Sequence, residues 1–157
     1  MPSPVIDREQ SPGARVPLAG ARVLVVEDNT ALRELTADVL ALEGCVVTEA
    51  SDTKAMQRAL HLGALTRFPE EAFDLIVTDA RMPGGSGIDA LERLRAKGCH
   101  IPAVMVTAFP EDATRRHVSE LDAMLLPKPF SLADLRAVAD LVLRTHPKTP
   151  PTTAWTV

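Results

Sequence analysis

The chain has few aromatic residues, few cysteines and no long hydrophobic run. Aromatic side chains make up 3% of its 157 residues, against a hydrophobic fraction of 46%, so aliphatic side chains must fill the core. No run approaches the roughly 18 apolar residues of a membrane span, and the start of the chain carries Asp7 and Glu9 where a signal peptide needs an apolar stretch. We therefore expect a cytoplasmic protein with no membrane partner.

Cysteine, histidine and positive charge are too sparse to predict a disulfide, a histidine-bound metal site or a nucleic-acid-binding surface. Cys45 and Cys99 each begin an apolar run, where a thiol behaves as a small buried hydrophobe, and no disulfide is expected in the cytoplasm. The histidines lack the close spacing typical of metal ligands. A net charge of −4 argues against the clustered basic surface that nucleic acid requires. Direct contact with nucleic acid is therefore not expected.

Proline marks the two ends of the chain. Seven of the 13 prolines lie at positions 2, 4, 12, 17, 147, 150 and 151. Residues 1–19 and 146–157 are therefore predicted to be flexible tails. Residues 20–145 are predicted to form one domain of ordinary size.

Apolar runs alternate with segments of helical period in this domain. The runs predict strands at 21–26, 45–50, 73–78, 101–106 and 123–126. Helices are predicted from residue 30 to a cap at Gly44, and over 53–66, 87–97, 111–120 and 132–144, the last capped by Ser131. This alternation predicts a parallel sheet covered on both faces, a three-layer α/β sandwich with five strands and five helices.

Residues suited to phosphoryl chemistry stand where four of the predicted strands end. Glu27 and Asp28 follow the first strand, and Asp79 follows the third. Thr107 follows the fourth strand, and Lys128 comes shortly after the fifth. Because the carboxyl ends of parallel strands meet at one edge of a sheet, we expect these side chains to share a single crevice.

Three carboxylates in one crevice need a cation. Two carboxylates about 4 Å apart repel by roughly 4 kcal/mol at an effective dielectric constant of about 20. Mg²⁺ takes oxygen ligands and leaves positions free for phosphate oxygens, while an Asp carboxylate can itself attack phosphorus and form an aspartyl phosphate. Asp79 would supply the nucleophile, Lys128 the positive charge and Thr107 the hydroxyl.

Other enzyme classes fit the same residues less well. A phosphatase of the haloacid dehalogenase type needs a second acid two residues after its nucleophile, and position 81 is Arg. The GGSG segment at 84–87 lacks the Lys-Ser/Thr ending of a phosphate-binding loop. Taken singly, the acids at 27 and 28 would suit a helix N-terminus. Thr107 would be a common residue at a strand end, and Lys128 would be an ordinary surface lysine. Only the set indicates a site.

Four segments together resemble the receiver domain of two-component response regulators: VVEDN (25–29), TDARMPGGSG (78–87), VTA (106–108) and KPF (128–130). The resemblance runs from Ala21 to about Arg144. It implies a flavodoxin-like fold with strand order 2-1-3-4-5. It also implies a signalling phosphoacceptor rather than an enzyme, although a receiver contributes to its own phosphotransfer and dephosphorylation.

The resemblance assigns a role to each site residue. Asp79 would accept the phosphoryl group from a phosphohistidine of a histidine kinase or phosphotransfer protein. Asp28, Asp79 and the backbone carbonyl of Arg81 would hold Mg²⁺, with Glu27 acting mostly through water. Thr107 and Lys128 would grip the phosphoryl oxygens. Gly87 and Pro129, the latter after a cis peptide bond in many receivers, match further positions of the family.

The sequence departs from the receiver pattern at three places. Leu125 stands where receivers usually carry the Tyr or Phe that moves together with Thr107, and either a smaller movement of Leu125 or a movement of Phe109 would be needed instead. The segment from Leu60 to Phe73 is longer than the family norm, and a tolerated surface insertion is favoured over a partner contact. The turn before the fifth strand, at residues 121–123, has no glycine.

Two functions remain open at this point. The first is a stand-alone receiver that acts as a relay or switch on a separate protein, since the text after Arg144 is too short for an output domain. The second is a constitutive protein-binding module with a receiver fold whose output does not depend on phosphorylation. A homodimer is compatible with both.

Overall fold

The structure, a computed structural model, describes residues 18–63, 72–82 and 85–146. The predicted tails lie outside the described residues, apart from residues 18–19 and 146. The central part of the segment from Leu60 to Phe73 also lies outside them, so the expected insertion stays a prediction. None of the described helices is long and apolar enough to cross a membrane.

Five parallel strands form one sheet in the order β2-β1-β3-β6-β7. The strands are β1 (Arg22–Val26), β2 (Val46–Ala50), β3 (Leu75–Asp79), β6 (Ala103–Thr107) and β7 (Ala123–Pro127). This arrangement confirms the expected parallel sheet and the strand order 2-1-3-4-5, with β6 and β7 as the fourth and fifth strands. A two-stranded antiparallel hairpin, β4 (Arg81–Met82) with β5 (Gly85–Ser86), was not predicted.

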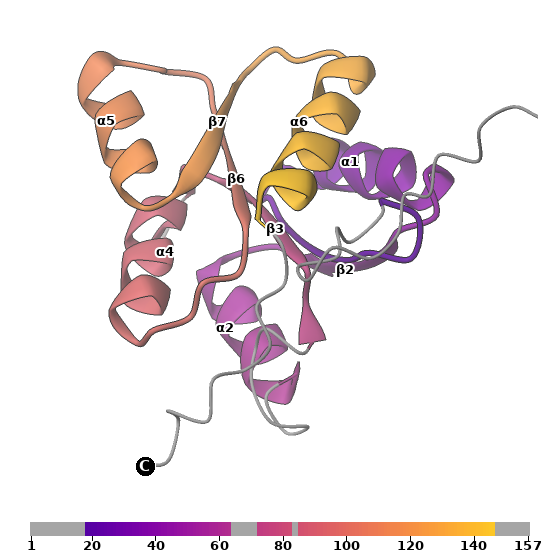
Figure 1. Ribbon diagram of the computed structural model, residues 1–157, viewed down its shortest axis with the longest axis horizontal. Helices are drawn as coiled ribbons and strands as arrows, with labels where there is room; N and C mark the ends of the chain where they lie inside the picture. Colours follow the sequence, from indigo (N-terminus) through magenta and orange to yellow (C-terminus); the bar gives the residue numbers. More distant parts are fainter. Residues whose placement is uncertain (1–17, 64–71, 83–84, 147–157) are drawn as a thin grey trace, which may run out of the picture.

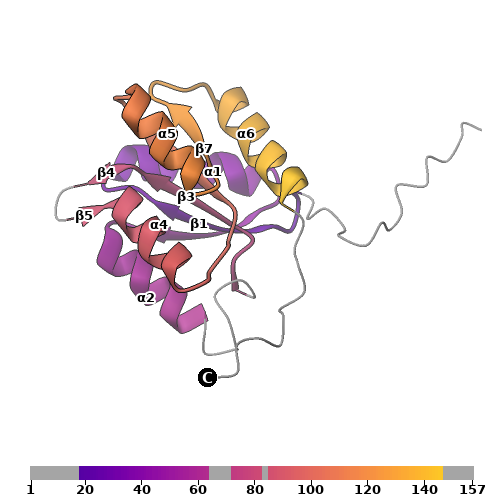
Figure 2. The same cartoon turned by 60° about the vertical axis from the view of Figure 1, so that its left-hand side comes forward.

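Five described helices cover the two faces of the sheet, which confirms the three-layer α/β sandwich (Figures 1 and 2). They are α1 (Thr30–Leu42), α2 (Thr53–Gly63), α4 (Gly87–Ala96), α5 (Asp112–Glu120) and α6 (Leu132–Thr145). Buried residues of α1 and α6 pack on one face in one cluster, and those of α2, α4 and α5 pack on the other. The carboxyl edge of the sheet, where the sequence predicts the site, therefore lies between two helical layers.

Strand β1 shows why a continuous apolar run forms a central strand. Val23 and Val25 belong to the cluster beneath α1 and α6, whereas Leu24 and Val26 belong to the cluster beneath α2 and α4. Successive side chains of a strand point to opposite faces, and both faces are covered here. All four residues are consequently buried, so no polar residue interrupts the run.

Four strands begin later than the sequence predicts, β1 and β2 by one residue and β3 and β6 by two. β6 begins at Ala103 rather than at residue 101, after Pro102, which has no backbone N–H for a ladder. β3 begins at Leu75 rather than at residue 73. The preceding Asp74 turns its carboxylate back to Arg22, accepting from its backbone N–H at 2.8 Å and pairing with its guanidinium at 3.2 Å. Both strands end at the positions that matter for the site.

The helix ends follow the expected capping chemistry. Gly44 has a positive φ of 91° and donates to the carbonyl of Ala41, as the cap predicted after α1 requires. Ser131 accepts from the backbone of Asp134 in a capping box at the start of α6. After α5, Asp122 adopts a φ of 55° and takes the place of the missing glycine, a conformation that Asp tolerates better than most residues.

Gly87, at the start of α4, is predicted to be irreplaceable. A Cβ there would lie 1.9 Å from the carbonyl oxygen of Asp79 and 2.8 Å from Thr78 Oγ1. Since backbone must move to admit it, we expect Gly87→Ala to lower the free energy of unfolding by about 2 kcal/mol or more in a denaturant titration. Gly85→Ala is the matched control, because its Cβ meets mainly the rotatable side chain of Thr53. Equal stability of the two variants would contradict this account.

Candidate functional site

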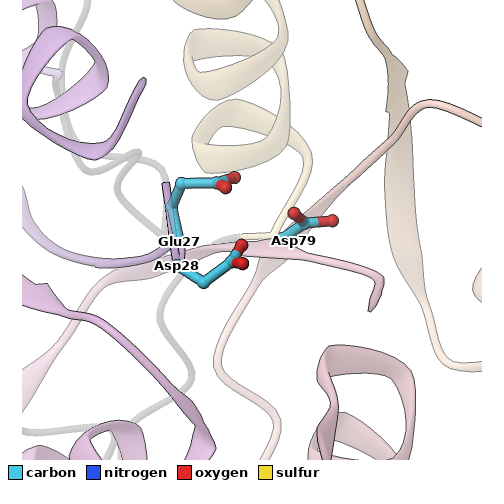
Figure 3. Close-up of side chains that lie close together, drawn as sticks. All are labelled: Glu27, Asp28 and Asp79. Atoms are coloured by element: carbon cyan, nitrogen blue, oxygen red, sulfur yellow. The ribbon is translucent and has the colours of Figure 1, made fainter. Parts of the chain in front are cut away.

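The residues predicted to form the site do meet at the carboxyl edge of the sheet. Glu27 and Asp28 directly follow β1, Asp79 ends β3 and Thr107 ends β6. Lys128 directly follows β7. Figure 3 shows the three acidic side chains gathered at the ends of β1 and β3. Residues separated by up to 101 positions along the chain therefore contact one another here.

The three carboxylates form a compact oxygen-donor cluster. One oxygen each from Glu27, Asp28 and Asp79 lie within 4.8 Å of one another. Glu27 is 5% exposed and Asp79 is 8% exposed, whereas Asp28 is open to solvent. A donor set made only of oxygens, with one open side, fits a hard cation such as Mg²⁺, which keeps several waters.

Lys128 is the internal counter-ion of this cluster. Its Nζ donates to Asp79 Oδ2 at 2.9 Å and to Glu27 Oε2 at 3.1 Å. Burial by itself would lower the pKa of Lys128, but the hydrogen bonds to Asp79 and Glu27 outweigh that effect and raise it. The ammonium is therefore charged at neutral pH and joins the carboxylates of two different strands.

Glu27 carries the electrostatic strain of the cluster. Burial is the main cause that raises its pKa, and the charge of Asp79 raises it further. The backbone N–H of Asn29, which donates to Glu27 Oε1 at 3.2 Å, and the ammonium of Lys128 partly oppose this shift. The net direction is upward, so the charged carboxylate of Glu27 is held at a cost to the fold.

The backbone around Asp79 is fixed from several sides. The N–H of Arg81 donates to Asp79 Oδ1 at 3.2 Å, and Thr78 Oγ1 donates to the carbonyl of Asp79 at 3.1 Å. The N–H of Ala80 donates to the carbonyl of Val106 at 2.8 Å, which ties the end of β3 to β6. One oxygen of Asp79 thus faces Lys128, and the other faces a backbone N–H.

Thr107 and Leu125 lie on neighbouring strands beside the cluster. Thr107 is buried, and its hydroxyl accepts from the backbone N–H of Phe109 at 3.1 Å. Leu125 is half-buried and packs against the core cluster beneath α2, α4 and α5. Phe109 itself is 62% exposed. The peptide bond between Lys128 and Pro129 is cis, as the receiver resemblance implies.

Two residues of the site were not identified from the sequence. Asn29 caps α1 by accepting from Leu32 N at 2.9 Å, while its own N–H holds Glu27. An Asn directly before a helical segment is a usable capping signal. Arg33 donates through Nη1 to the backbone carbonyl of Glu27 at 2.9 Å. A contact to a backbone carbonyl selects no particular partner residue, so it leaves no sequence signal.

Comparisons with known proteins agree on one family. Residues 23–140 match the family model described as the response regulator receiver domain. The chain is 35% identical over 125 residues to the response regulator protein FleR of Pseudomonas aeruginosa, covering 79% of this chain and 24% of FleR. It is also 36% identical over 126 residues to the phosphate regulon transcriptional regulatory protein PhoB of Escherichia coli, covering 78% of this chain and 52% of PhoB. The chain thus spans about a quarter to a half of these relatives.

Solved structures show the same fold. The non-phosphorylated HemR receiver domain from Leptospira biflexa superposes with a TM-score of 0.70 at 28% identity, covering 84% of this chain and 98% of that domain. The chemotaxis response regulator CheY4 of Vibrio cholerae superposes with a TM-score of 0.65 at 25% identity, covering 79% of this chain and 99% of CheY4. Both likenesses extend over nearly the whole of the compared domain.

Neutralising Glu27 is expected to stabilise the metal-free protein. Because the pKa of Glu27 is raised in the fold, its charge destabilises the folded state at pH values above that pKa, and the effect disappears as the pH falls through it. Glu27→Gln should therefore have a higher Tm than the wild type at neutral pH, with the gap closing in acid. Circular dichroism melts across pH measure this. Glu34→Gln, on the exposed face of α1, should change little, and a lowered Tm for Glu27→Gln would refute the argument.

Proposed function

The chain belongs to the family of response regulator receiver domains, and we propose on that basis that Asp79 accepts a phosphoryl group from a phosphohistidine, with Mg²⁺ bound beside it. The observation that carries this proposal is the contact of Asp79 with Lys128 inside an acidic cluster of three carboxylates. Receiver domains generally bind Mg²⁺ at such a pocket. The donor would be a sensor histidine kinase or a histidine phosphotransfer protein.

The proposed reaction is a transfer between two nucleophiles. A carboxylate oxygen of Asp79 attacks phosphorus, the bond from phosphorus to the imidazole nitrogen of the donor breaks, and that nitrogen keeps the electron pair. Bound Mg²⁺ would neutralise charge on the transferring oxygens. Glu27, Asp28, Asp79 and the backbone carbonyl of Arg81 would hold the metal, Glu27 mostly through water. Asp79 forms the covalent bond, whereas Glu27, Asp28 and the Arg81 carbonyl would act by positioning and charge.

Lys128 and Thr107 are proposed to respond to the new charge. The phosphoryl group carries about two negative charges and three strong acceptor oxygens, in place of the single charge of the free Asp79 carboxylate. Lys128 already contacts Asp79 Oδ2, so its ammonium is within reach of an oxygen added to that carboxylate. Thr107 would turn its hydroxyl from the Phe109 N–H toward a phosphoryl oxygen, and this change of partner would carry the signal into the loop before α5.

The output is proposed to pass to a partner protein. PhoB and KdpE, both of Escherichia coli, are transcriptional regulatory proteins by name. The net charge of −4 gives no support to direct DNA contact by this chain. We therefore place the signal in a protein contact that changes on phosphorylation, with a second copy of the chain as one such partner.

A constitutive binding module is the second candidate, and Leu125 is the observation that favours it. Leu125 is half-buried among apolar side chains, and it has neither the ring nor the polar tip of a Tyr. A residue that makes the same contacts before and after phosphorylation cannot shift an equilibrium between two states. The two candidates differ in whether a change at Asp79 reaches β7.

Phosphorylation is expected on Asp79 alone. Wild-type protein incubated with Mg²⁺ and acetyl phosphate should gain one phosphoryl group by intact mass, and Asp79→Asn should gain none because an amide is not nucleophilic. Removal of Mg²⁺ with a chelator should suppress the adduct. Asp89→Asn, an exposed acid in the first turn of α4, is the matched control and should react like the wild type. An unreactive wild type would sink the proposal.

The switch is tested by the phosphoryl analogue beryllofluoride. With Mg²⁺ present, we expect it to shift the NMR amide signals of Thr107, Phe109 and Leu125 as well as those next to Asp79. Thr107→Ala should keep the shifts near Asp79 and lose those in β7, because the relaying hydroxyl is gone. Shifts that stay beside Asp79 in the wild type would favour the constitutive module instead.

A further inference from the structure

Arg33 makes an unusual pair of contacts beside the acidic cluster. Its Nη1 donates to the backbone carbonyl of Glu27 at 2.9 Å, and its Nε lies 3.4 Å from Glu49 Oε1. The side chain of Arg33 is 16% exposed, while that of Glu49 is 44% exposed. Arg33 is the fourth residue of α1, and its guanidinium therefore connects the loop after β1 with the end of β2.

The carbonyl of Glu27 controls the direction of Asp28. The C=O of Glu27 and the N–H of Asp28 belong to one planar peptide unit. A hydrogen bond that fixes the Glu27 carbonyl therefore also fixes the orientation of the peptide group that leads into Asp28. The Glu27 N–H is already held by the carbonyl of Ala50 at 3.0 Å. The Glu27 carboxylate is held separately, by Asn29 and Lys128. The side chain of Asp28 is exposed, so packing does little to orient it.

We propose that Arg33 is a positioning residue that aims the Asp28 carboxylate at the metal position. The proposal rests on the proposed Mg²⁺ site and adds a residue to it. Glu49 keeps the guanidinium turned toward the Glu27 carbonyl, and the end of β2 serves as the anchor. Arg33 touches neither the metal position nor the phosphoryl group and acts through one peptide plane.

The positioning role and simple electrostatics predict opposite changes in Mg²⁺ affinity when Arg33 is removed. Arg33 is a cation close to a cation site, so its charge by itself opposes Mg²⁺, and its removal would tighten binding. If Arg33 acts by orientation, its removal lets Asp28 swing away and weakens binding. Ligand-supporting residues of this kind typically change metal affinity by about tenfold or more. The direction of the change therefore separates the two roles.

The test compares Mg²⁺ affinity by calorimetry in metal-free proteins. Arg33→Met keeps most of the aliphatic stem and should bind Mg²⁺ roughly tenfold more weakly. Arg33→Lys keeps a donor that reaches the carbonyl and should recover part of the loss. Glu49→Gln should stay near the wild type, because Gln keeps an Oε1 that can accept from Arg33 Nε and hold the guanidinium toward the carbonyl. Arg136→Met, which removes an arginine of α6 paired at 3.0 Å with Glu43, the residue directly after α1, is the matched control for lost charge and should leave the affinity unchanged.

A second readout separates positioning from general damage. With acetyl phosphate, Arg33→Met should need about tenfold more Mg²⁺ for half-maximal phosphorylation and should reach the wild-type rate at saturating Mg²⁺. Equal or tighter Mg²⁺ binding by Arg33→Met overturns the proposal, as does a lowered rate at saturation. If Arg33→Met does not fold, Arg33→Lys is compared with the wild type instead. Weaker Mg²⁺ binding by Arg33→Lys then supports the proposal, and equal or tighter binding overturns it. A wild type that binds no Mg²⁺ overturns the proposed function as well. If the wild type binds Mg²⁺ and is phosphorylated, a negative result for the Arg33 variants overturns only the role of Arg33.

Discussion

The repulsion between carboxylates at one edge of the sheet is the constraint on which the rest of the site depends. Glu27 and Asp79 are nearly buried at the ends of adjacent strands, where their charges cannot be screened by bulk water. Lys128 forms ion pairs with both carboxylates. It directly follows β7, which pairs with neither β1 nor β3. Its two partners lie 101 and 49 positions away in the sequence, so only the folded sheet can bring these charges together.

The main features of the fold could be predicted because burial on both faces leaves a strong pattern. Residues 23–26 of β1 and 75–77 of β3 are continuous apolar runs, since both faces of the sheet are covered there. The site could be predicted for a related reason: Glu27, Asp79 and Thr107 are polar residues placed directly where such runs stop. What the pattern does not encode is contact with backbone. Arg33 meets a carbonyl, and the β4–β5 hairpin is held by main-chain pairing, so neither needs a distinctive residue type.

Strand limits were harder to predict than strand existence for a physical reason. An apolar run can begin before the first paired residue of a strand, because residues just outside a strand can still be buried. Ile101 is buried although β6 begins only at Ala103, and Phe73 is buried although β3 begins only at Leu75. Turn chemistry has a similar ambiguity. Asp122 adopts the left-handed conformation that Gly44 and Gly98 adopt at other helix ends, and composition alone does not distinguish such an Asp from a solvated one.

The strain in the acidic cluster would favour both ligands of the proposed function, a metal ion and a phosphoryl group. A raised pKa for Glu27 means that the metal-free fold carries an unfavourable charge, which any bound cation relieves. Lys128 supplies that relief first, through two hydrogen bonds to carboxylates. If Mg²⁺ takes over part of this neutralisation, the ammonium is released to bind the negative charge that phosphorylation brings. Under the proposed function, the stability lost to like charges at Glu27 is what would make the site sensitive to added charge.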